Sequence, residues 1–270
     1  MTCEICNSDI FKYDKNLSCE CANCGILYNL QTKALDYSNG GGQDIPSTMK
    51  SKLRIKNALK RFEIINPHIQ KHNIFVDIGC GSGEMLEASK EYFEHHIGYD
   101  ANKVLIKHTQ DKSLITYNKF FSIQDINTEN IPNQGIVLSI NHVLEHVSQP
   151  IDMLNNIFVN LSKGDIVYIE VPLHTGYSFK SKKYEWSLWY EEHLALYSLD
   201  TLMYIANKLN MQILDKGYKN FISDNENKKM LLKQFLINPM NFISSMMTKE
   251  KYQSVLDIIL KDYGFIVLQK

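Results

Sequence analysis

The chain has 270 residues, 29 of them basic and 30 acidic, which gives a formal net charge of -1. This length allows one sizeable domain with a small attachment. Because no excess positive charge is available to hold a phosphate backbone, the composition argues against nucleic acid as the substrate. The sequence shows no secretory signal and no apolar run of the roughly 20 residues that a membrane-spanning helix needs, so we expect a cytoplasmic protein without a membrane span.

Five of the six cysteines fall within the first 24 residues. Cys3/Cys6 and Cys21/Cys24 each form a C-x-x-C pair, and two such pairs can supply four thiolates to one tetrahedral ion. A reducing cytoplasm disfavours disulfides, so the spacing predicts a structural Zn2+ site. Cys19 is a competing ligand, since it lies close to Cys21 and could replace it. A redox or incidental cysteine cluster is the alternative.

A flexible segment separates the cysteines from the rest of the chain. Residues 38–47 contain three adjacent glycines and Pro46, which are typical of a linker or a mobile lid. The next stretch has apolar residues at helical spacing with lysines between them, the pattern of a helix with a solvated basic face, and Pro67 ends it. We therefore divide the chain into a zinc-binding module with its linker, residues 1–45, and a second domain, residues 46–270.

From about residue 73 short apolar runs alternate with helical stretches, which is the pattern of a parallel sheet covered by helices. It predicts an α/β fold with a doubly wound, mostly parallel, seven-stranded Rossmann-like sheet. The expected strands are 74–79, 96–100, 135–140, 165–171, 211–218 and 265–269, with a weaker one at 119–123. The expected helices are 83–94, 102–111, 150–162 and 199–209.

The first of these strands continues into VDIGCGSGEML, where Gly79, Gly81 and Gly83 follow Asp77. Glycines at a strand-to-helix turn let a ligand approach the main chain closely. A nicotinamide-dinucleotide loop needs its last glycine one residue later, where this chain has Glu84, and a carboxylate there would face the pyrophosphate. S-adenosylmethionine carries no phosphate, so it removes this conflict.

Further matches follow in chain order. Asp100 ends the second strand, GYD, where a carboxylate can accept hydrogen bonds from ribose hydroxyls. QDI (124–126) and LEHV (144–147) come next, and with the glycine loop they resemble the motifs of class I S-adenosylmethionine-dependent methyltransferases over about residues 73–218. The resemblance implies a set of residues around the cofactor, with Asp125 and Ile126 at the adenine: Asp77, Gly79, Gly81, Gly83, Asp100, Ala101, Asp125, Ile126 and Asn141.

The class of methyl acceptor is inferred from the motifs of other acceptor classes that the sequence lacks. No D/N-P-P-Y/F motif of base-amine methylation follows the fourth strand, and Cys80 lies inside the cofactor loop, so no cysteine is placed for cytosine C5 chemistry. Paired acidic residues of catechol-type enzymes are also not apparent. Since methyl transfer requires alignment and removal of a proton from the acceptor, a hydroxyl activated by a general base is the simplest case.

Four histidines are candidate bases: His142, His146, His174 and His193. His142 follows the fourth strand most closely and is the better pocket candidate of the first two, while His146 is more often structural. His193 follows Glu192 in a long insertion rich in aromatic residues and lysines, which can cover an acceptor site. The alternative for His193 is a capping or salt-bridged position before the next helix.

The cysteine module, the core and the Glu-His pair together resemble sugar methyltransferases of deoxysugar and polysaccharide pathways, including 3'-C-methyltransferases of nucleotide-linked ketosugars. This resemblance implies acid/base roles for Glu192 and His193, and Trp186, Trp189 and Tyr190 would suit the apolar face of a sugar. The C-methyltransferases continue into a large C-terminal domain, whereas this sequence ends after 270 residues. We therefore expect O-methylation of a sugar, either nucleotide-linked or part of a polysaccharide precursor.

The pattern of residues 225–264 predicts a helical insertion with several methionines. Such helices usually belong to the core or to a homodimer surface, and a substrate lid is the more specific but less common alternative. Three other functions remain open at this point. They are C-methylation of a nucleotide ketosugar, methylation of RNA by an enzyme with a zinc module, and binding of S-adenosylmethionine without catalysis.

Overall fold

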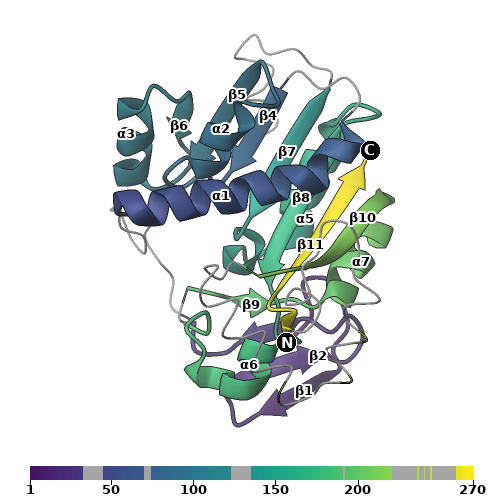
Figure 1. The fold of residues 1–270 in the computed structure, drawn as a ribbon. Helices are drawn as coiled ribbons and strands as arrows, with labels where there is room; N and C mark the ends of the chain where they lie inside the picture. Colours follow the sequence, from purple (N-terminus) through teal and green to yellow (C-terminus); the bar gives the residue numbers. More distant parts are fainter. Residues whose placement is uncertain are drawn as a thin grey trace.

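The computed structural model describes residues 1–32, 45–69, 74–122, 135–190, 192–220, 236, 240, 244 and 260–270. Its largest feature is a seven-stranded sheet with the order β10-β11-β8-β7-β4-β5-β6 (Figure 1). The strands are β4 (Ile74–Ile78), β5 (His95–Asp100), β6 (Thr116–Asn118), β7 (Ile136–Asn141), β8 (Ile166–Pro172), β10 (Gln212–Lys219) and β11 (Tyr263–Gln269).

The strands of this sheet are mostly parallel. The pairs β4–β5, β4–β7, β5–β6 and β7–β8 are parallel, and only β11 runs antiparallel to both of its neighbours, β8 and β10. The predicted doubly wound, Rossmann-like sheet is therefore confirmed. Because the parallel strands end at one edge, their carboxyl ends bring together residues that are far apart in the sequence.

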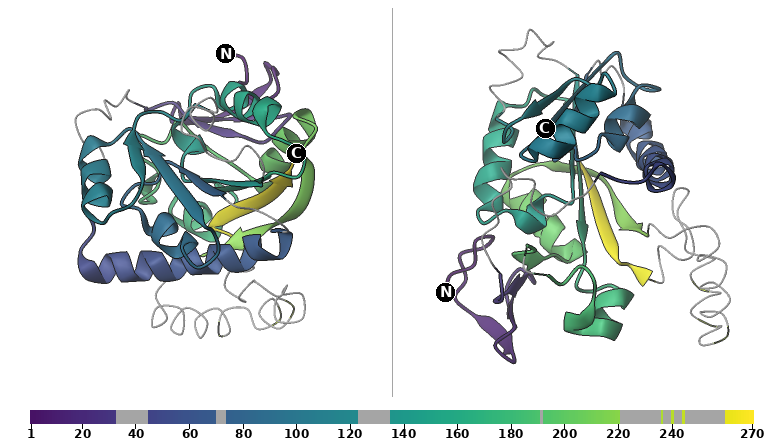
Figure 2. Two further views of the ribbon diagram at one scale, coloured as in Figure 1. Left: turned by 90° about the horizontal axis from the view of Figure 1, so that it is seen from above. Right: turned by 90° about the vertical axis from the view of Figure 1, so that its left-hand side faces the viewer.

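Helices cover both faces of the sheet (Figure 2). On one face, α1 (Thr48–Ile65), α2 (Glu84–Ser89) and α3 (Lys103–Asp111) contribute residues such as Phe62, Leu86 and Ile106 to a core with strand residues. On the other face, α5 (Pro150–Asn160) and α7 (Leu199–Lys208) contribute Phe158 and Leu202 to a second core. Alternate residues of the strands thus pack against opposite helical layers.

Several element boundaries differ from those expected. Helix α1 ends at Ile65, and Pro67 lies in the short 3-10 helix η2 (Asn66–His68), because a proline is tolerated at the start of a helical turn but not inside a helix. Helix α2 ends at Ser89, earlier than predicted. The weak strand β6 lies before the predicted range 119–123. Ser198 caps α7 with a capping box to Thr201, as its position before the helix suggested.

A second, four-stranded antiparallel sheet contains the cysteine segment. It has the order β1-β2-β3-β9, formed by β1 (Phe11–Asp14), β2 (Ser18–Cys21), β3 (Leu27–Asn29) and β9 (Ala195–Leu196). Strand β9 comes from the insertion after β8 and pairs Leu196 with Leu27 and Ala195 with Tyr28. The cysteine segment is therefore joined to the segment that follows His193 by backbone hydrogen bonds, which the sequence did not predict.

The insertion after β8 also contains helix α6 (Tyr177–Lys182) and the 3-10 helix η4 (Lys183–Glu185), while η3 (Leu144–His146) follows β7. Of the expected helical insertion 225–264, only residues 236, 240, 244 and 260–264 are among those described. Within the described part of the chain, no helix combines the length and the apolar character needed to cross a membrane.

Candidate active site and metal centre

The glycine loop lies between β4 and α2 at the carboxyl edge of the sheet. Gly79, Gly81 and Gly83 have φ of 71°, 52° and 86°, the left-handed region that favours glycine. The backbone N–H of Gly79 donates to the carbonyl of Tyr99 on β5 at 2.8 Å, which ties the loop to the neighbouring strand. A Cβ on Gly79 would lie 2.5 Å from Cγ2 of Val143, so the close packing of the loop requires glycine there.

Asp100 ends β5 beside this loop. One carboxylate oxygen accepts a hydrogen bond from the N–H of Gly81 at 2.8 Å, and the other accepts from the N–H of Asn102 at 2.7 Å. Both contacts fix the carboxylate in orientation while leaving lone pairs for a ligand hydroxyl. Ala101 follows directly and Asn102 caps α3.

Asp77 and Asn141 are two further residues of the predicted cofactor set that the structure describes. Burial raises the pKa of Asp77 to about 7, against a hydrogen bond from Ser139 and the charge of Arg61. Asn141 donates to the Ser139 hydroxyl, and its buried Oδ1 has no hydrogen-bond partner among the described residues. An orphaned acceptor at a strand end suits a ligand donor. Asp125 and Ile126, predicted at the adenine, lie outside the described residues.

A buried row of charged groups lies beside the ends of β7 and β8. His142, at the end of β7, places Nε2 3.2 Å from the carboxylate of Glu170 and Nδ1 3.2 Å from that of Glu145. The guanidinium of Arg61 hydrogen-bonds both oxygens of Glu170. Tyr168 donates to the same carboxylate at 2.7 Å. Positive and negative groups thus alternate from α1 to η3.

His193 lies at the end of this row of charged groups, next to Glu145. Its Nε2 is 4.0 Å from the carboxylate of Glu145, and 3% of the residue is exposed. The His146 ring lies against it, with 4.6 Å between the ring centroids, and so does the Tyr190 ring, at 4.2 Å. The main-chain N–H of Leu194 donates to the carbonyl of Glu145 at 2.7 Å, which fixes the two segments to each other.

The two predicted base histidines differ in charge. Burial lowers the pKa of His193 to about 4, although Glu145 acts in the opposite direction, so its ring is neutral near pH 7. For His142 burial also opposes the charged form, but hydrogen bonds to Glu145 and Glu170 prevail and raise its pKa to about 9. A ring that is already protonated cannot accept a proton, so His193 is the better base of the two.

Comparison with known proteins identifies the fold family. A family of proteins described as "Methyltransferase domain" matches residues 49–216, well over half of the chain. The chain belongs to this methyltransferase family. No curated protein matches it by sequence.

Solved structures share the fold of the methyltransferase at low identity. A SAM-dependent methyltransferase from Archaeoglobus fulgidus is 19% identical, with a TM-score of 0.55 over 82% of this chain and 98% of that one. Coclaurine N-methyltransferase bound to N-methylheliamine and SAH is 12% identical, with a TM-score of 0.53 over 87% and 80%. A plantazolicin methyltransferase in complex with a triazolic desmethylPZN analog and SAH is 18% identical, with a TM-score of 0.51 over 81% and 84%.

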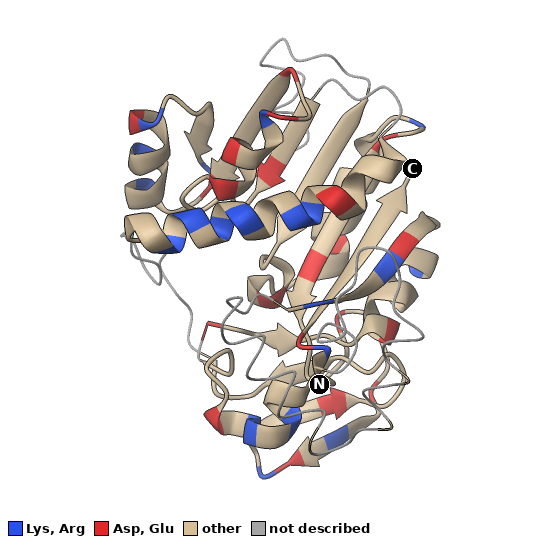
Figure 3. Ribbon diagram, viewed as in Figure 1, with Lys and Arg blue, Asp and Glu red and all other residues tan. Residues whose placement is uncertain are grey.

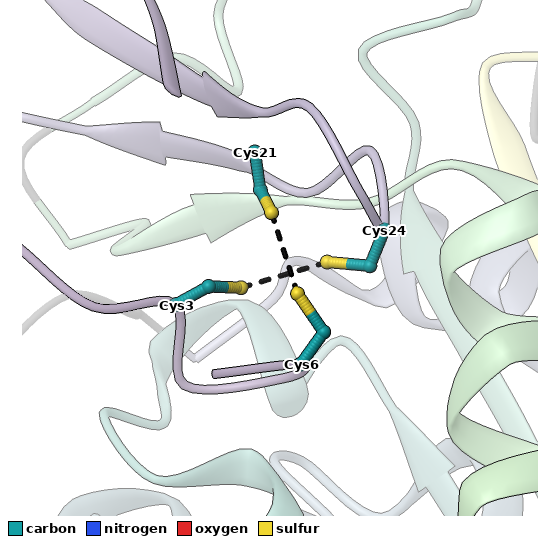
Figure 4. A group of neighbouring side chains, drawn as sticks. All are labelled: Cys3, Cys6, Cys21 and Cys24. Carbon is teal, nitrogen blue, oxygen red and sulfur yellow. Dashed lines mark hydrogen bonds between the residues drawn. The ribbon is translucent and has the colours of Figure 1, made fainter. Parts of the chain in front are cut away.

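The four predicted cysteine ligands of the methyltransferase come together (Figure 4). One sulfur each of Cys3, Cys6, Cys21 and Cys24 lies within 4.8 Å of the others, with 3.5 Å between Cys3 and Cys24 and 3.4 Å between Cys6 and Cys21. Cys19 is not part of this group, and its thiol contacts the sulfur of Met1 at 3.4 Å. The group has the ligand type and number of a closed zinc site.

A second group in the methyltransferase also has the composition of a metal site. Glu145, His146 and His193 each offer one ligand atom, and these atoms lie within 4.8 Å of one another. Glu192, the carboxylate predicted beside His193, instead contributes its main-chain oxygen, which lies 3.0 Å from Nδ1 of His146. His174 is not part of this group, and its Nε2 bonds the carbonyl of Gly25 at 2.8 Å.

The two tryptophans do not lie as predicted. Trp186 and Trp189 are buried in a hydrophobic cluster with Phe179, Leu27 and Leu196, where they attach the cysteine sheet to the insertion. They are therefore packing residues in this structure and do not present a face to a sugar. Tyr190, at 36% exposure, remains accessible beside His193.

Sequence reasoning missed Glu145, Glu170 and Arg61. Glu145 was identified only as part of the LEHV motif. Glu170 lay within a predicted strand, and Arg61 lay among the basic residues of a predicted helix. A carboxylate inside an otherwise apolar strand, as in IVYIEVP, is the signal that could have marked Glu170.

Proposed function

We propose that this methyltransferase transfers the methyl group of S-adenosylmethionine to a hydroxyl of a sugar, free as a nucleotide sugar or within a polysaccharide precursor. The cofactor part rests on the glycine loop, on Asp100 and on the orphaned oxygen of Asn141. The hydroxyl of Ser82 donates to the Glu84 carboxylate beside the start of α2, so that end of the helix holds an anion of the chain itself and suits a cofactor without phosphates.

The single observation that carries acceptor activation is the approach of His193 and Glu145 at the edge where β7 ends. With a neutral ring, His193 offers a lone pair to the acceptor hydroxyl, and Glu145 stabilises the positive charge that develops when the proton arrives. The hydroxyl oxygen then attacks the methyl carbon in line with the C–S bond, and the bonding electron pair leaves with sulfur. Glu192, whose main-chain oxygen bonds His146, supports the same segment.

The sugar as acceptor is supported by the resemblance of the cysteine module and the Glu-His pair to sugar methyltransferases, and by the accessible Tyr190 ring beside the candidate base. An aromatic ring next to a proton acceptor suits a sugar, which has both an apolar face and hydroxyls. We also infer that Cys3, Cys6, Cys21 and Cys24 bind one structural Zn2+.

The test is incubation of the full chain with S-adenosylmethionine and a panel of nucleotide sugars and glycans, followed by mass spectrometry for a gain of one CH2 unit. Proton and carbon NMR of the product distinguishes an O-methyl from a C-methyl group. We expect His193→Ala to reduce turnover by about 10²–10⁴-fold while S-adenosylhomocysteine binding stays unchanged. Full activity of this variant, or a carbon-linked methyl group, would contradict the proposed reaction.

A further inference from the structure

We propose that Glu145, His146 and His193 bind a divalent transition-metal cation, at a site separate from the four cysteines. Two imidazoles and one carboxylate are a ligand set of non-haem metal centres. The ligand atoms come from η3 and from the segment before β9, and they lie within 4.8 Å of one another. His193 and Glu145 are 3% and 0% exposed, so both of these ligand side chains are buried.

The orientation of His146 matches that of a metal ligand. Its Nδ1 lies 3.0 Å from the main-chain oxygen of Glu192, and a carbonyl oxygen can only accept a hydrogen bond. Nδ1 therefore carries a hydrogen, and Nε2 is the nitrogen that would bind the metal. A backbone carbonyl that fixes the tautomer in this way is a common outer partner of metal-bound histidine.

Glu145 also has the surroundings of a ligand. One carboxylate oxygen lies 3.2 Å from Nδ1 of His142 and 4.0 Å from Nε2 of His193. The other, Oε2, is buried and has no hydrogen-bond partner among the described residues. An unpartnered carboxylate oxygen away from water is costly, and a cation would satisfy it. His142 would remain as the outer hydrogen-bond donor to the carboxylate, as in many metal sites.

The distances allow one ion to reach all three ligands. Metal–nitrogen and metal–oxygen bonds are about 2.1 Å long, so two atoms on the same ion are at most about 4.2 Å apart. The 4.0 Å between Nε2 of His193 and Oε1 of Glu145 lies within this limit. Because all three ligand atoms lie within 4.8 Å of one another, contraction of the widest pair by about half an ångström or less lets one ion bind all three residues. Nitrogen and oxygen ligands without sulfur favour Mn2+, Fe2+ or Zn2+.

Three protein ligands leave positions open for acceptor oxygens, and this consequence rests on the proposed function. A hydroxyl bound to the cation has a lowered pKa and loses its proton to water. Its oxygen then forms the bond to the methyl carbon while the C–S bond breaks and its electron pair stays on sulfur. With the cation present His193 is a ligand, and the cation replaces the ring in activating the hydroxyl.

The test titrates the full chain, loaded with one equivalent of Zn2+ for the four thiolates, with Mn2+, which competes poorly for thiolates, and follows binding by electron paramagnetic resonance. We expect one saturable Mn2+ per chain and a loss of affinity of about 100-fold or more in Glu145→Gln and in His193→Gln. His96→Gln, which removes a histidine from β5, is the matched control and should bind as the unaltered chain does. Circular dichroism and S-adenosylhomocysteine binding show that the variants are folded.

Absence of saturable Mn2+ binding, or equal affinity in Glu145→Gln and the control, would overturn the site. The proposed function can fail separately. Methylation of no sugar with Mn2+ binding intact would contradict the sugar acceptor and leave the metal site standing. Methylation that persists after removal of the bound Mn2+ would assign activation to the His193 ring and contradict the role given to the cation.

Discussion

The guanidinium of Arg61 on α1 donates hydrogen bonds to both carboxylate oxygens of Glu170 on β8, although the two residues lie 109 positions apart. Lys and Arg residues are frequent along α1 (Figure 3). Those of its first half are exposed, as predicted, whereas Arg61 is buried. The pair holds α1 over the carboxyl edge of the sheet and places a fixed negative charge beside His142.

We expect Arg61→Met to lower the free energy of unfolding by about 3–5 kcal/mol, because it leaves a buried carboxylate without its partner. Burial disfavours ionisation of Glu170, but the charge of Arg61 prevails and lowers its pKa to about 2. Denaturant unfolding near pH 7 measures the effect. The double variant Arg61→Met/Glu170→Met should recover part of the loss, and equal losses in both variants would show that the pairing itself does not matter.

Asp77→Asn should change how stability depends on pH. Burial raises the pKa of Asp77 in the folded chain to about 7, so the folded state favours the protonated form. The stability that Asp77 contributes is therefore fully present below the pKa that its carboxyl has in the unfolded chain, and it is lost as the pH rises through about 7. As the pH rises from about 4 to about 8, the free energy of unfolding of Asp77→Asn should increase by up to about 4 kcal/mol relative to that of the unaltered chain.

Urea unfolding without cofactor at a series of pH values measures this difference. Asp111→Asn, which removes a similar charge from the exposed end of α3, is the control and should show a nearly constant difference. A constant difference for Asp77→Asn as well would mean that Asp77 ionises normally in the folded chain.

Removal of the proposed zinc ion should loosen the segment that contains His193. Strand β3 pairs with β9, and the carbonyl of Cys24 accepts a hydrogen bond from the hydroxyl of Thr201 in α7 at 2.8 Å. Disorder of the cysteine group would therefore reach both β9 and α7. Hydrogen exchange read by mass spectrometry should show faster exchange in residues 192–197 after chelation. Cys19→Ser should keep its zinc and its protection, and unchanged exchange in the zinc-free chain would show that β9 holds without the metal.

Gly79→Ala should destabilise the chain by about 1–3 kcal/mol more than Gly164→Ala. Both glycines have positive φ, but an added Cβ on Gly79 would meet Cγ2 of Val143 at 2.5 Å, whereas one on Gly164 would meet nothing within 4 Å. The comparison therefore separates crowding from backbone strain. Thermal unfolding and S-adenosylmethionine affinity measure the two effects. Equal losses of stability in both variants would show that backbone strain alone, and not crowding against Val143, is responsible.

Local patterns predicted the parts of the molecule that local chemistry determines. The glycine turn after β4 and the four cysteines of the metal group depend on short spacings, and the structure has them as expected. The parallel sheet followed from apolar runs that alternate with helical ones. The zinc ion and the sugar acceptor stay predictions.

The proposed acceptor site could not be predicted in the same way, because its contacts join segments that are distant in the chain. The choice of Glu192 as the partner of His193 followed sequence adjacency, whereas the carboxylate that faces the ring comes from Glu145 in η3. Trp186 and Trp189 were predicted to contact the sugar because aromatic residues in a loop suggest exposure. In the structure they pack against Leu27 and Leu196 of the cysteine sheet. Strand β9, with two residues, is too short to recognise by periodicity.

The pairing of β3 with β9 has a consequence for synthesis of the chain. Residues 27–29 leave the ribosome long before residues 195–196 exist, so during most of translation β3 is the open edge of a three-stranded sheet. Such an edge can pair with the wrong chain. Early capture of a metal ion by Cys3, Cys6, Cys21 and Cys24 would hold β2 and β3 in place until the correct partner strand arrives, so metal supply during growth would influence the yield of correctly folded protein.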